Sequence, residues 1–269
     1  MNAFKDPKLN ILACGYADLF SIHNRWNFDR VSVPYWRLYW NEKPGAMLIH
    51  GSRRVNLKPS SMVLIAPHTI YSTHNHGHIG QLYFHFQLMI PSRSLKPYIA
   101  AIPVDPCLRN LAGGIIALLR RQKPTTWRLS LYARALVELA LANVIDDLGS
   151  FPVFDARVQS AIAYLEERLD EPISNAALAG QADLSVSAFA HLFKKQVGYS
   201  PCNFLMLKRV EKACLMLHFT NSPIKQIAEE LGFYDRYHFS RVFKREQGMG
   251  PAEFRSKNYP FFREAPSPT

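Results

Sequence analysis

The chain has 269 residues, of which 48% are hydrophobic, and its formal net charge is +11. This length and composition are typical of a globular protein with two domains. No apolar run reaches the roughly 18 residues of a membrane-spanning helix, and the first residues lack the apolar core of a secretion signal, so we expect a cytoplasmic protein without a membrane partner.

The four cysteines never form a CxxC pair, which argues against a zinc ribbon and against a dithiol redox site. The positive charge favours a polyanionic partner, but it is unevenly placed. Residues 1–152 contain 17 Lys and Arg against 8 Asp and Glu, whereas residues 153–269 contain 15 against 13. The position of the charges along the chain is therefore more informative than their total.

Residues 31 to about 90 carry short β-branched or aromatic runs: VSVPYWRLYW, GAMLIH, RVNL, SMVLIAP and QLYFHFQL. Turn formers separate these runs, so we expect a small antiparallel barrel or sandwich. Two helical patterns follow, and the second, WRLSLYARALVELALANVIDD, is apolar on nearly every face. Because a barrel covers only one side of such a helix, we expect this helix, with Leu136, Ala140 and Val144, to contribute to a homodimer.

The stretch DDLGSFPVFDA interrupts the helical period with Gly, Ser and Pro, which predicts a linker. Asp155 is placed to cap the first helix of a new domain. The expected domains are residues 1–149 and residues 155–259.

The last third of the chain contains the same helical pattern twice, with an offset of 50 residues from Phe193 to Phe243 and from Gly198 to Gly248. Each copy consists of a short helix, a tight turn, and a second helix with apolar residues at i, i+3 and i+4 before a glycine. This arrangement is typical of a helix-turn-helix, and its repetition in register argues against a chance match.

The period of 3.6 residues gives the second helix of each copy an apolar face and an outward face. The outward residues are placed to meet base edges and phosphates: Ser187, Ala190, His191 and Lys194 in the first copy, and Arg236, Tyr237, Ser240, Arg241 and Lys244 in the second. Arg241 can donate two hydrogen bonds to guanine, whereas Arg236 and Lys244 suit phosphate. The first copy offers only thymine-methyl contacts, single hydrogen bonds or readout of groove shape.

The segments ISNAALAGQADLSVSAFAHLFKKQVGYSP, LKRVEKACLML and SPIKQIAEELGFYDRYHFSRVFKREQGMGPAEFR resemble the DNA-binding domain of AraC/XylS-type transcriptional regulators over about residues 155–257. The resemblance implies two helix-turn-helix units, joined by a long helix near residues 201–217, that read successive major-groove segments at the outward residues. The chain departs from the family at His191, where arginine is common. It also departs at Tyr234, where a serine cap is usual, so that Asp235 becomes the expected cap.

The order of strands, two helices, linker and DNA-binding domain is similar to family members with a cupin-like sensor domain. Fragments such as SMVLIAPHTIY and YFHF carry this similarity. It implies a small-molecule effector inside the barrel and a helix-mediated dimer. The expected fold class is α+β, with an N-terminal antiparallel β-barrel and two helices followed by an all-α double helix-turn-helix domain.

A ligand pocket needs a few convergent polar groups on an aromatic lining. Strand alternation makes Arg37, Tyr39, Tyr83 and His85 the candidates for such a pocket. The alternative is a core histidine with satisfied hydrogen bonds and a surface arginine. Similarly, the positive charge of residues 1–152 suits an anionic effector, but a solvated basic face explains it as well.

His74, His76 and His78 would share one face of an extended strand and could then bind a metal. However, turn formers lie between them and no carboxylate lies near in the sequence to complete a cupin-type site. We therefore favour a solvated loop and expect no bound metal.

We expect a sequence-specific transcriptional regulator, an activator rather than an enzyme, that acts without a cofactor. Its expected partners are double-stranded DNA, a small-molecule effector, a second copy of the chain and RNA polymerase. Two alternatives stay open. One is a metal-dependent cupin enzyme fused to a DNA-binding module, and the other is an effector-independent regulator whose barrel serves only for dimerisation.

Overall fold

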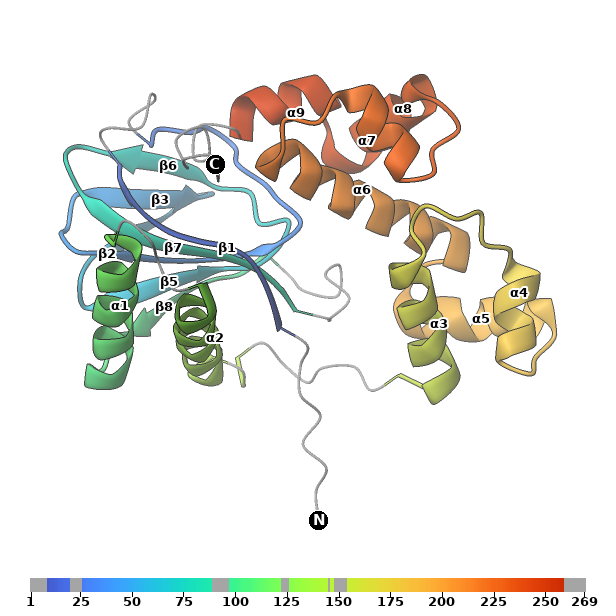
Figure 1. Ribbon diagram of the computed structural model, residues 1–269, viewed down its shortest axis with the longest axis horizontal. Coiled ribbons are helices and arrows are strands. Elements are labelled where there is room, and N and C mark those ends of the chain that lie inside the picture. Colours follow the sequence, from blue (N-terminus) through green and yellow to red (C-terminus); the bar gives the residue numbers. More distant parts are fainter. Residues whose placement is uncertain are drawn as a thin grey trace, which may run out of the picture. The chain divides into compact units, whose positions relative to one another are not determined.

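The structure is a computed structural model that describes residues 9–19, 26–88, 97–121, 126–144, 146–147 and 154–258. The chain divides into two compact units between Phe151 and Pro152. In their described parts, the first unit holds the strands and two helices, and the second is helical (Figure 1). The turn formers of the expected linker lie outside the described residues. No described helix is long and apolar enough to cross a bilayer.

The described part of the first unit contains two antiparallel sheets and two helices. Its elements are β1 (Leu9–Asp18), β2 (Trp36–Asn41), β3 (Ala46–His50), β4 (Arg53–Leu57), β5 (Ser61–Ile65), β6 (Ser72–Asn75), β7 (Gly80–Leu88), β8 (Ile99–Pro103), α1 (Pro106–Leu119) and α2 (Thr126–Ala142). One sheet has the strand order β1-β7-β2-β5-β8, and the other has the order β4-β3-β6.

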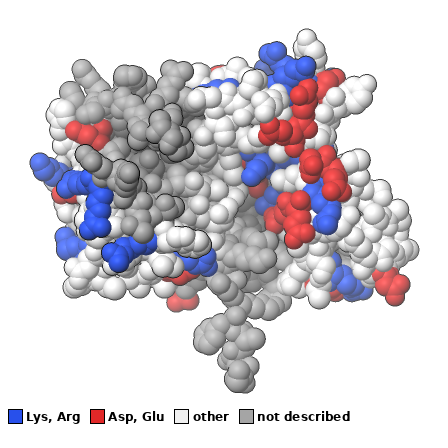
Figure 2. Space-filling model, viewed as in Figure 1, with Lys and Arg blue, Asp and Glu red and all other residues white. Residues whose placement is uncertain are grey.

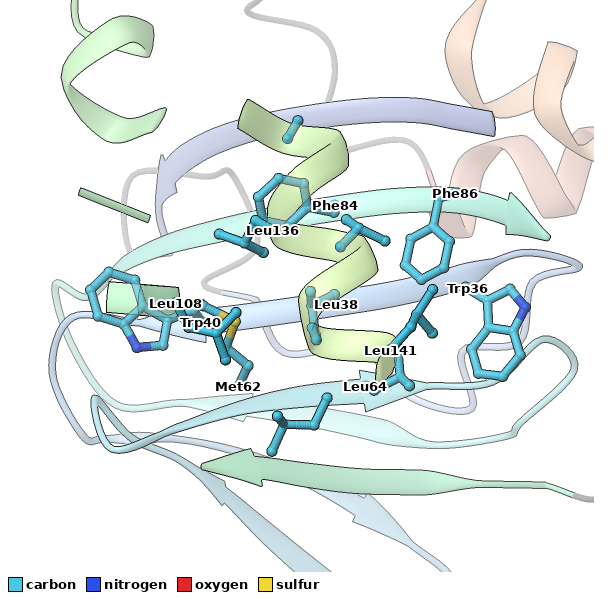
Figure 3. Packing of buried hydrophobic residues seen from close by; sticks show 14 of the residues in the cluster. Trp36, Leu38, Trp40, Met62, Leu64, Phe84, Phe86, Leu108, Leu136 and Leu141 are labelled. Carbon is cyan, nitrogen blue, oxygen red and sulfur yellow. The ribbon is translucent and has the colours of Figure 1, made fainter. Parts of the chain in front are cut away.

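Both faces of the five-stranded sheet are buried at its centre, so β2 and β7 are covered almost throughout. On one face, aromatic and aliphatic side chains such as Trp36, Phe84 and Phe86 pack against α1 and α2. Figure 3 shows Leu136 and Leu141 of α2 within this core. Because successive residues of a strand point to opposite faces, the alternate residues of β2 and β7 lie on the face away from the helices.

The expected barrel is not closed, because the described strands form two separate sheets. The turn at the Lys58–Ser61 bridge carries the chain from β4 in the small sheet to β5 in the large one. Alternating apolar and polar residues define the two faces of each strand equally well in a barrel and in a sandwich. The sequence pattern therefore predicted the strands but could not determine which of them share hydrogen bonds.

The second unit consists of helices, several of which begin at a capping side chain. They are α3 (Ala156–Glu167), α4 (Asn175–Gln181), α5 (Val186–Val197), α6 (Pro201–Phe219), α7 (Ile224–Glu230), α8 (Arg236–Gln247) and α9 (Pro251–Asn258). The side chains of Asp155, Ser174, Ser185 and Asp235 each accept a hydrogen bond from a backbone N–H in the first turn of α3, α4, α5 and α8. These bonds satisfy donors that a helix start leaves open, and the two caps expected from the sequence, Asp155 and Asp235, are confirmed.

The helices α5 and α8 also end alike. Gly198 stops α5 with φ +84°, and Gly248 stops α8 with φ +76°. A residue with a side chain would be strained in this left-handed conformation, which is why glycine occurs at the same point of both copies.

Gly232 precedes α8 and has a second requirement for glycine. Its φ is +64°, and a Cβ built there would lie 2.2 Å from the carbonyl oxygen of Asp170. We expect Gly248→Ala, which meets no neighbour within 4 Å, to lower the free energy of unfolding by about 1 kcal/mol from backbone strain alone. Gly232→Ala should cost about 3 kcal/mol or more, because steric overlap adds to the strain.

Urea unfolding followed by far-ultraviolet circular dichroism measures both costs. Equal losses of stability for Gly232→Ala and Gly248→Ala would contradict the close approach of Gly232 to Asp170.

Candidate functional site

The helices α5 and α8 carry the residues expected to meet DNA. In each helix two phenylalanines four residues apart lie in the core, Phe189 and Phe193 in α5 and Phe239 and Phe243 in α8. Because a helix repeats every 3.6 residues, burial of these rings turns the opposite face outward. The outward residues are exposed, except for half-buried Ala190 and Ser240, and comprise Ser187, Ala190, His191 and Lys194 on α5 and Arg236, Tyr237, Ser240, Arg241 and Lys244 on α8.

Cationic groups on α8 are free to meet a ligand. The side chains of Arg236, Arg241 and Lys244 form no hydrogen bond or ion pair with any described residue, whereas neighbouring Arg245 pairs with Glu246 at 2.9 Å. Acidic and basic side chains are mixed over the helical unit in the view of Figure 2. The candidate interface is therefore defined by local unpaired cations, not by a uniform positive field.

The expected ligand-binding residues come together on the face of the five-stranded sheet opposite α1 and α2. The register of β2 and β7 places Arg37 opposite His85 and Tyr39 opposite Tyr83. All four side chains are buried, and only 6% of Arg37 is exposed. The alternative that Arg37 is a surface residue is therefore wrong.

Phenol groups surround the guanidinium of Arg37. It donates a hydrogen bond to Tyr71, and its central carbon lies 5.4 Å from the ring centre of Tyr35 and 5.8 Å from that of Tyr71. Burial opposes the charge, but the phenolic oxygens of Tyr39, Tyr71 and Tyr35 raise the pKa of Arg37 well above its usual range. No described carboxylate pairs with this buried cation, and its Nε has no hydrogen-bond partner among the described residues.

Aromatic rings complete this polar cluster. The imidazole of His85 lies 5.2 Å from the ring of Tyr35, 5.3 Å from that of Tyr83 and 6.3 Å from that of Tyr39, measured between ring centres. Burial, with a smaller contribution from Cys14, raises the pKa of Tyr83 to about 12, and burial also raises the pKa of Tyr39. Both phenols therefore stay protonated at neutral pH and can donate hydrogen bonds beside a cation, a combination suited to an anionic ligand.

The three histidines considered for a metal site are exposed and do not share one strand. His74 lies in β6, whereas His76 and His78 follow its end. The Nδ1 atom of His78 lies 2.9 Å from a carboxylate oxygen of Asp18. Among the described residues, no three His, Cys, Asp or Glu side chains are grouped so that they could hold a metal ion.

The helix α2 is less fully apolar than its sequence suggested. Leu136, Ala140 and Val144 are buried in the core of the same chain, so they are not available to a second subunit. The exposed apolar residues lie one helical face away, at Trp127 and Leu131, which are 82% and 65% exposed. The sequence pattern indicated a helix that needs two covers, but it did not show which residues the sheet would bury.

Known proteins match the helical unit most strongly. A family model described as a helix-turn-helix domain matches residues 178–257. The arabinose operon regulatory protein of Salmonella typhimurium is 38% identical over 106 residues, which cover 39% of this chain and 38% of that protein. The transcriptional activator RhaS of Escherichia fergusonii is 36% identical over 101 residues, covering 38% of this chain and 36% of that protein.

The C-terminal unit is an AraC-family helix-turn-helix domain. The matched region spans little more than a third of the length of these relatives. A structure of ToxT from Vibrio cholerae strain SCE256 with bound unsaturated fatty acid aligns over 97% of this chain and 100% of its own, with a TM-score of 0.54 and 14% identity. A structure of ToxT from Vibrio cholerae O395 aligns over 93% of this chain and 97% of its own, with a TM-score of 0.52 and 13% identity. At this identity the likeness shows a shared fold, a β-rich domain followed by a helical one.

Two positions of interest were missed from the sequence. In the AraC-family domain, Tyr234 precedes Asp235, the cap of α8, and is 92% exposed. The sequence pattern indicated only that it departs from the usual serine. In the first unit, Tyr71 lies just before β6 and joins Arg37 across the two sheets. An exposed aromatic next to a reading helix is a signal that sequence could have supplied, whereas the Arg37–Tyr71 contact depends on long-range packing.

Arg37 offers a test of whether the polar cluster exists for stability. We expect Arg37→Met to change the free energy of unfolding of the first unit by less than about 1 kcal/mol, or to raise it, because methionine removes the cost of burying a charge. Phe84→Ala, on the opposite face of the sheet, should cost about 3–5 kcal/mol. All four tryptophans lie in the first unit, so tryptophan fluorescence during urea unfolding measures both effects. A loss above about 3 kcal/mol for Arg37→Met would mean that the cation is a structural element.

Proposed function

We propose that this protein is a sequence-specific, DNA-binding transcriptional regulator that responds to a small-molecule effector. The observation that carries the proposal is the pair of capped helices α5 and α8, each with one face fixed in the core and the other facing solvent. The relatives of the helical unit include an arabinose operon regulatory protein and RhaS, which is named as a transcriptional activator, so we propose activation, with RNA polymerase as a partner.

The two reading helices have different chemistry. On α8, Arg241 can donate two hydrogen bonds to guanine O6 and N7, and Arg236 and Lys244 can contact phosphates. On α5, Ser187 and His191 offer single hydrogen bonds and Ala190 a methyl contact, which discriminate less between bases. The second helix is therefore the stronger reader in this proposal.

The function is tested by selecting duplexes from a random DNA pool with the full-length protein and sequencing those that are retained. We expect a recurrent sequence whose binding weakens steeply as salt is raised, because counterions are released from the DNA. Retention of all sequences alike would overturn the proposed function.

Arg241 and Lys244 give a sharper comparison on the selected duplex. We expect Arg241→Ala to reduce discrimination between the selected duplex and a scrambled one by about 1–3 kcal/mol, because a base contact is lost. Lys244→Ala should weaken binding to both duplexes similarly, because a phosphate contact carries no sequence information. Competition assays measure both quantities, and an equal loss on the two duplexes for Arg241→Ala would refute its assignment to a base.

We propose that the effector binds at the polar cluster of Arg37, Tyr39, Tyr83 and His85. A buried cation without a paired carboxylate among the described residues, next to neutral phenols, favours a ligand with an anionic group. ToxT, which shares the fold, has been crystallised with an unsaturated fatty acid. That ligand belongs to ToxT, but a carboxylate is the kind of group that the cluster in this chain would bind.

We also propose a homodimer through α2, in which the exposed stripe of Trp127, Leu131 and Ala135 replaces the buried residues suggested by the sequence pattern. These residues follow one another at intervals of four, so they lie along one side of the helix, and all three are exposed. An apolar stripe on an otherwise polar surface is typical of a self-complementary contact.

Leu131→Glu should shift the protein from dimer to monomer in sedimentation velocity at micromolar concentration, because a charge would be buried at the contact. Ser130→Glu is the matched control, since it adds the same charge to an exposed position on another side of α2. A wild-type protein that sediments as a monomer would refute the dimer, and an equal effect of the two variants would refute the stripe.

A further inference from the structure

Arg209 lies at the middle of α6, the long helix between the two helix-turn-helix units, and is buried, with 4% exposed. Its guanidinium donates three hydrogen bonds to backbone carbonyls. Nε donates to Leu169 at 2.6 Å and Nη2 donates to Glu171 at 2.8 Å, both in the segment between α3 and α4. Nη1 donates to Gly232 at 2.7 Å, in the turn before α8. Within the helical part of the chain, one side chain therefore joins the first helix-turn-helix unit to the second helix-turn-helix unit.

The backbones of the two helix-turn-helix units also meet directly at this point. The space that a Cβ of Gly232 would need is occupied by the carbonyl group of Asp170. The ring of Phe233 lies 5.8 Å from the guanidinium carbon of Arg209. The junction between the two helix-turn-helix units, at Arg209, Gly232 and Asp170, is therefore tightly packed. Neither helix-turn-helix unit can approach the other more closely there without displacing the main chain.

The chemistry of Arg209 suits orientation rather than charge pairing. No described carboxylate forms an ion pair with it, and its three hydrogen bonds to described residues all end on carbonyl oxygens. A guanidinium is planar and holds its donors in fixed directions, so three simultaneous bonds define both a distance and an angle between the acceptors. Lysine has a single rotatable ammonium group and cannot reproduce that geometry.

We propose that Arg209 is a positioning residue that sets the spacing and rotation of α8 relative to α5. It thereby sets the spacing that one chain accepts between the two DNA segments read by α5 and α8. The inference rests on the proposed DNA-binding function. One base pair advances the duplex by about 3.4 Å and turns it by about 35°, so a reader with a fixed junction loses one set of base contacts when a single pair is inserted. A reader with a loose junction adapts to the insertion.

The experiment uses the full-length protein and the duplex that it selects from a random pool. Three further duplexes complete the set: one with a base pair inserted between the segments read by α5 and α8, and two in which one or the other segment is scrambled. For the wild type we expect at least about a tenfold weaker Kd on the inserted duplex than on the selected one. For Arg209→Lys we expect that ratio to fall to about threefold or less, while binding to each single-segment duplex stays within about twofold of the wild type.

Arg255→Lys is the matched control. The Nη2 of Arg255 also donates to a backbone carbonyl, that of Ser222 at 2.6 Å, but both residues belong to the second helix-turn-helix unit. This variant loses a comparable guanidinium contact without loosening the junction, so it should keep the wild-type ratio. Arg209→Gln, which retains two donors on a shorter side chain, should behave like Arg209→Lys.

The outcomes separate this inference from the proposed function. If the wild type selects no sequence, the proposed function fails and the inference fails with it. If the wild type selects a sequence but Arg209→Lys keeps the tenfold preference, or Arg255→Lys loses it equally, only the role of Arg209 is overturned. If circular dichroism shows both Arg209 variants unfolded at the assay temperature, Arg209 is required for the fold as a whole and the positioning role is likewise rejected.

Discussion

Three phenylalanine rings in each helix-turn-helix unit fix how the reading helices are rotated. In the first helix-turn-helix unit Phe193 lies 5.8 Å from Phe189 and 5.6 Å from Phe204 of α6, measured between ring centres. The second helix-turn-helix unit repeats this arrangement, with Phe243 5.5 Å from Phe239 and 5.3 Å from Phe254. Tilted and edge-on contacts between buried rings have preferred geometry and bury a large area, so they restrict rotation of the helix about its axis. The outward faces of α5 and α8 follow from this restriction, because every other side chain on the helix is then placed by the helical period.

The repeat explains why the helical unit could be predicted closely from the sequence. Caps, glycine stops and the 3.6-residue period are local signals, and Asp155, Asp235 and Gly248 perform the expected roles in the structure. Two copies supplied the same signals independently. By contrast, Phe204 and Phe254 lie beyond the reading helices, and only the folded chain shows that each closes a triplet of rings. Arg209 could not be assigned either, because its three acceptors lie 23 to 40 residues away.

The first unit was predicted less well for a related reason. Alternation along β2 and β7 correctly grouped Arg37 with Tyr39 and Tyr83 with His85, and the register of the two strands brings the pairs together. Which face the helices cover, however, depends on packing between elements far apart in sequence. Alternation also cannot show that the sheets stay separate or that Leu136 faces the core instead of a second subunit.

The same sheet therefore combines two environments of opposite character. One face packs into an apolar core, whereas the other buries Arg37 and several phenols at a desolvation cost that apolar residues would avoid. A fold under selection for stability alone has no need of that cation. The cost is consistent with a site kept for binding an anionic group.

The unequal chemistry of α5 and α8 makes the junction between them important. In the proposed function, Ser187, Ala190 and His191 provide little discrimination alone, so α5 would contribute mainly when α8 has already bound and holds it over the adjacent groove. Binding of α5 is then intramolecular, and its effective concentration at the DNA depends on how narrowly the connection to α8 limits its positions. A flexible connection would widen the range of those positions, lower the effective concentration of α5 and so reduce what its weak contacts add to binding. The buried hydrogen bonds of Arg209 and the close approach of Gly232 to Asp170 restrict them, so a modest reading helix can still add to specificity.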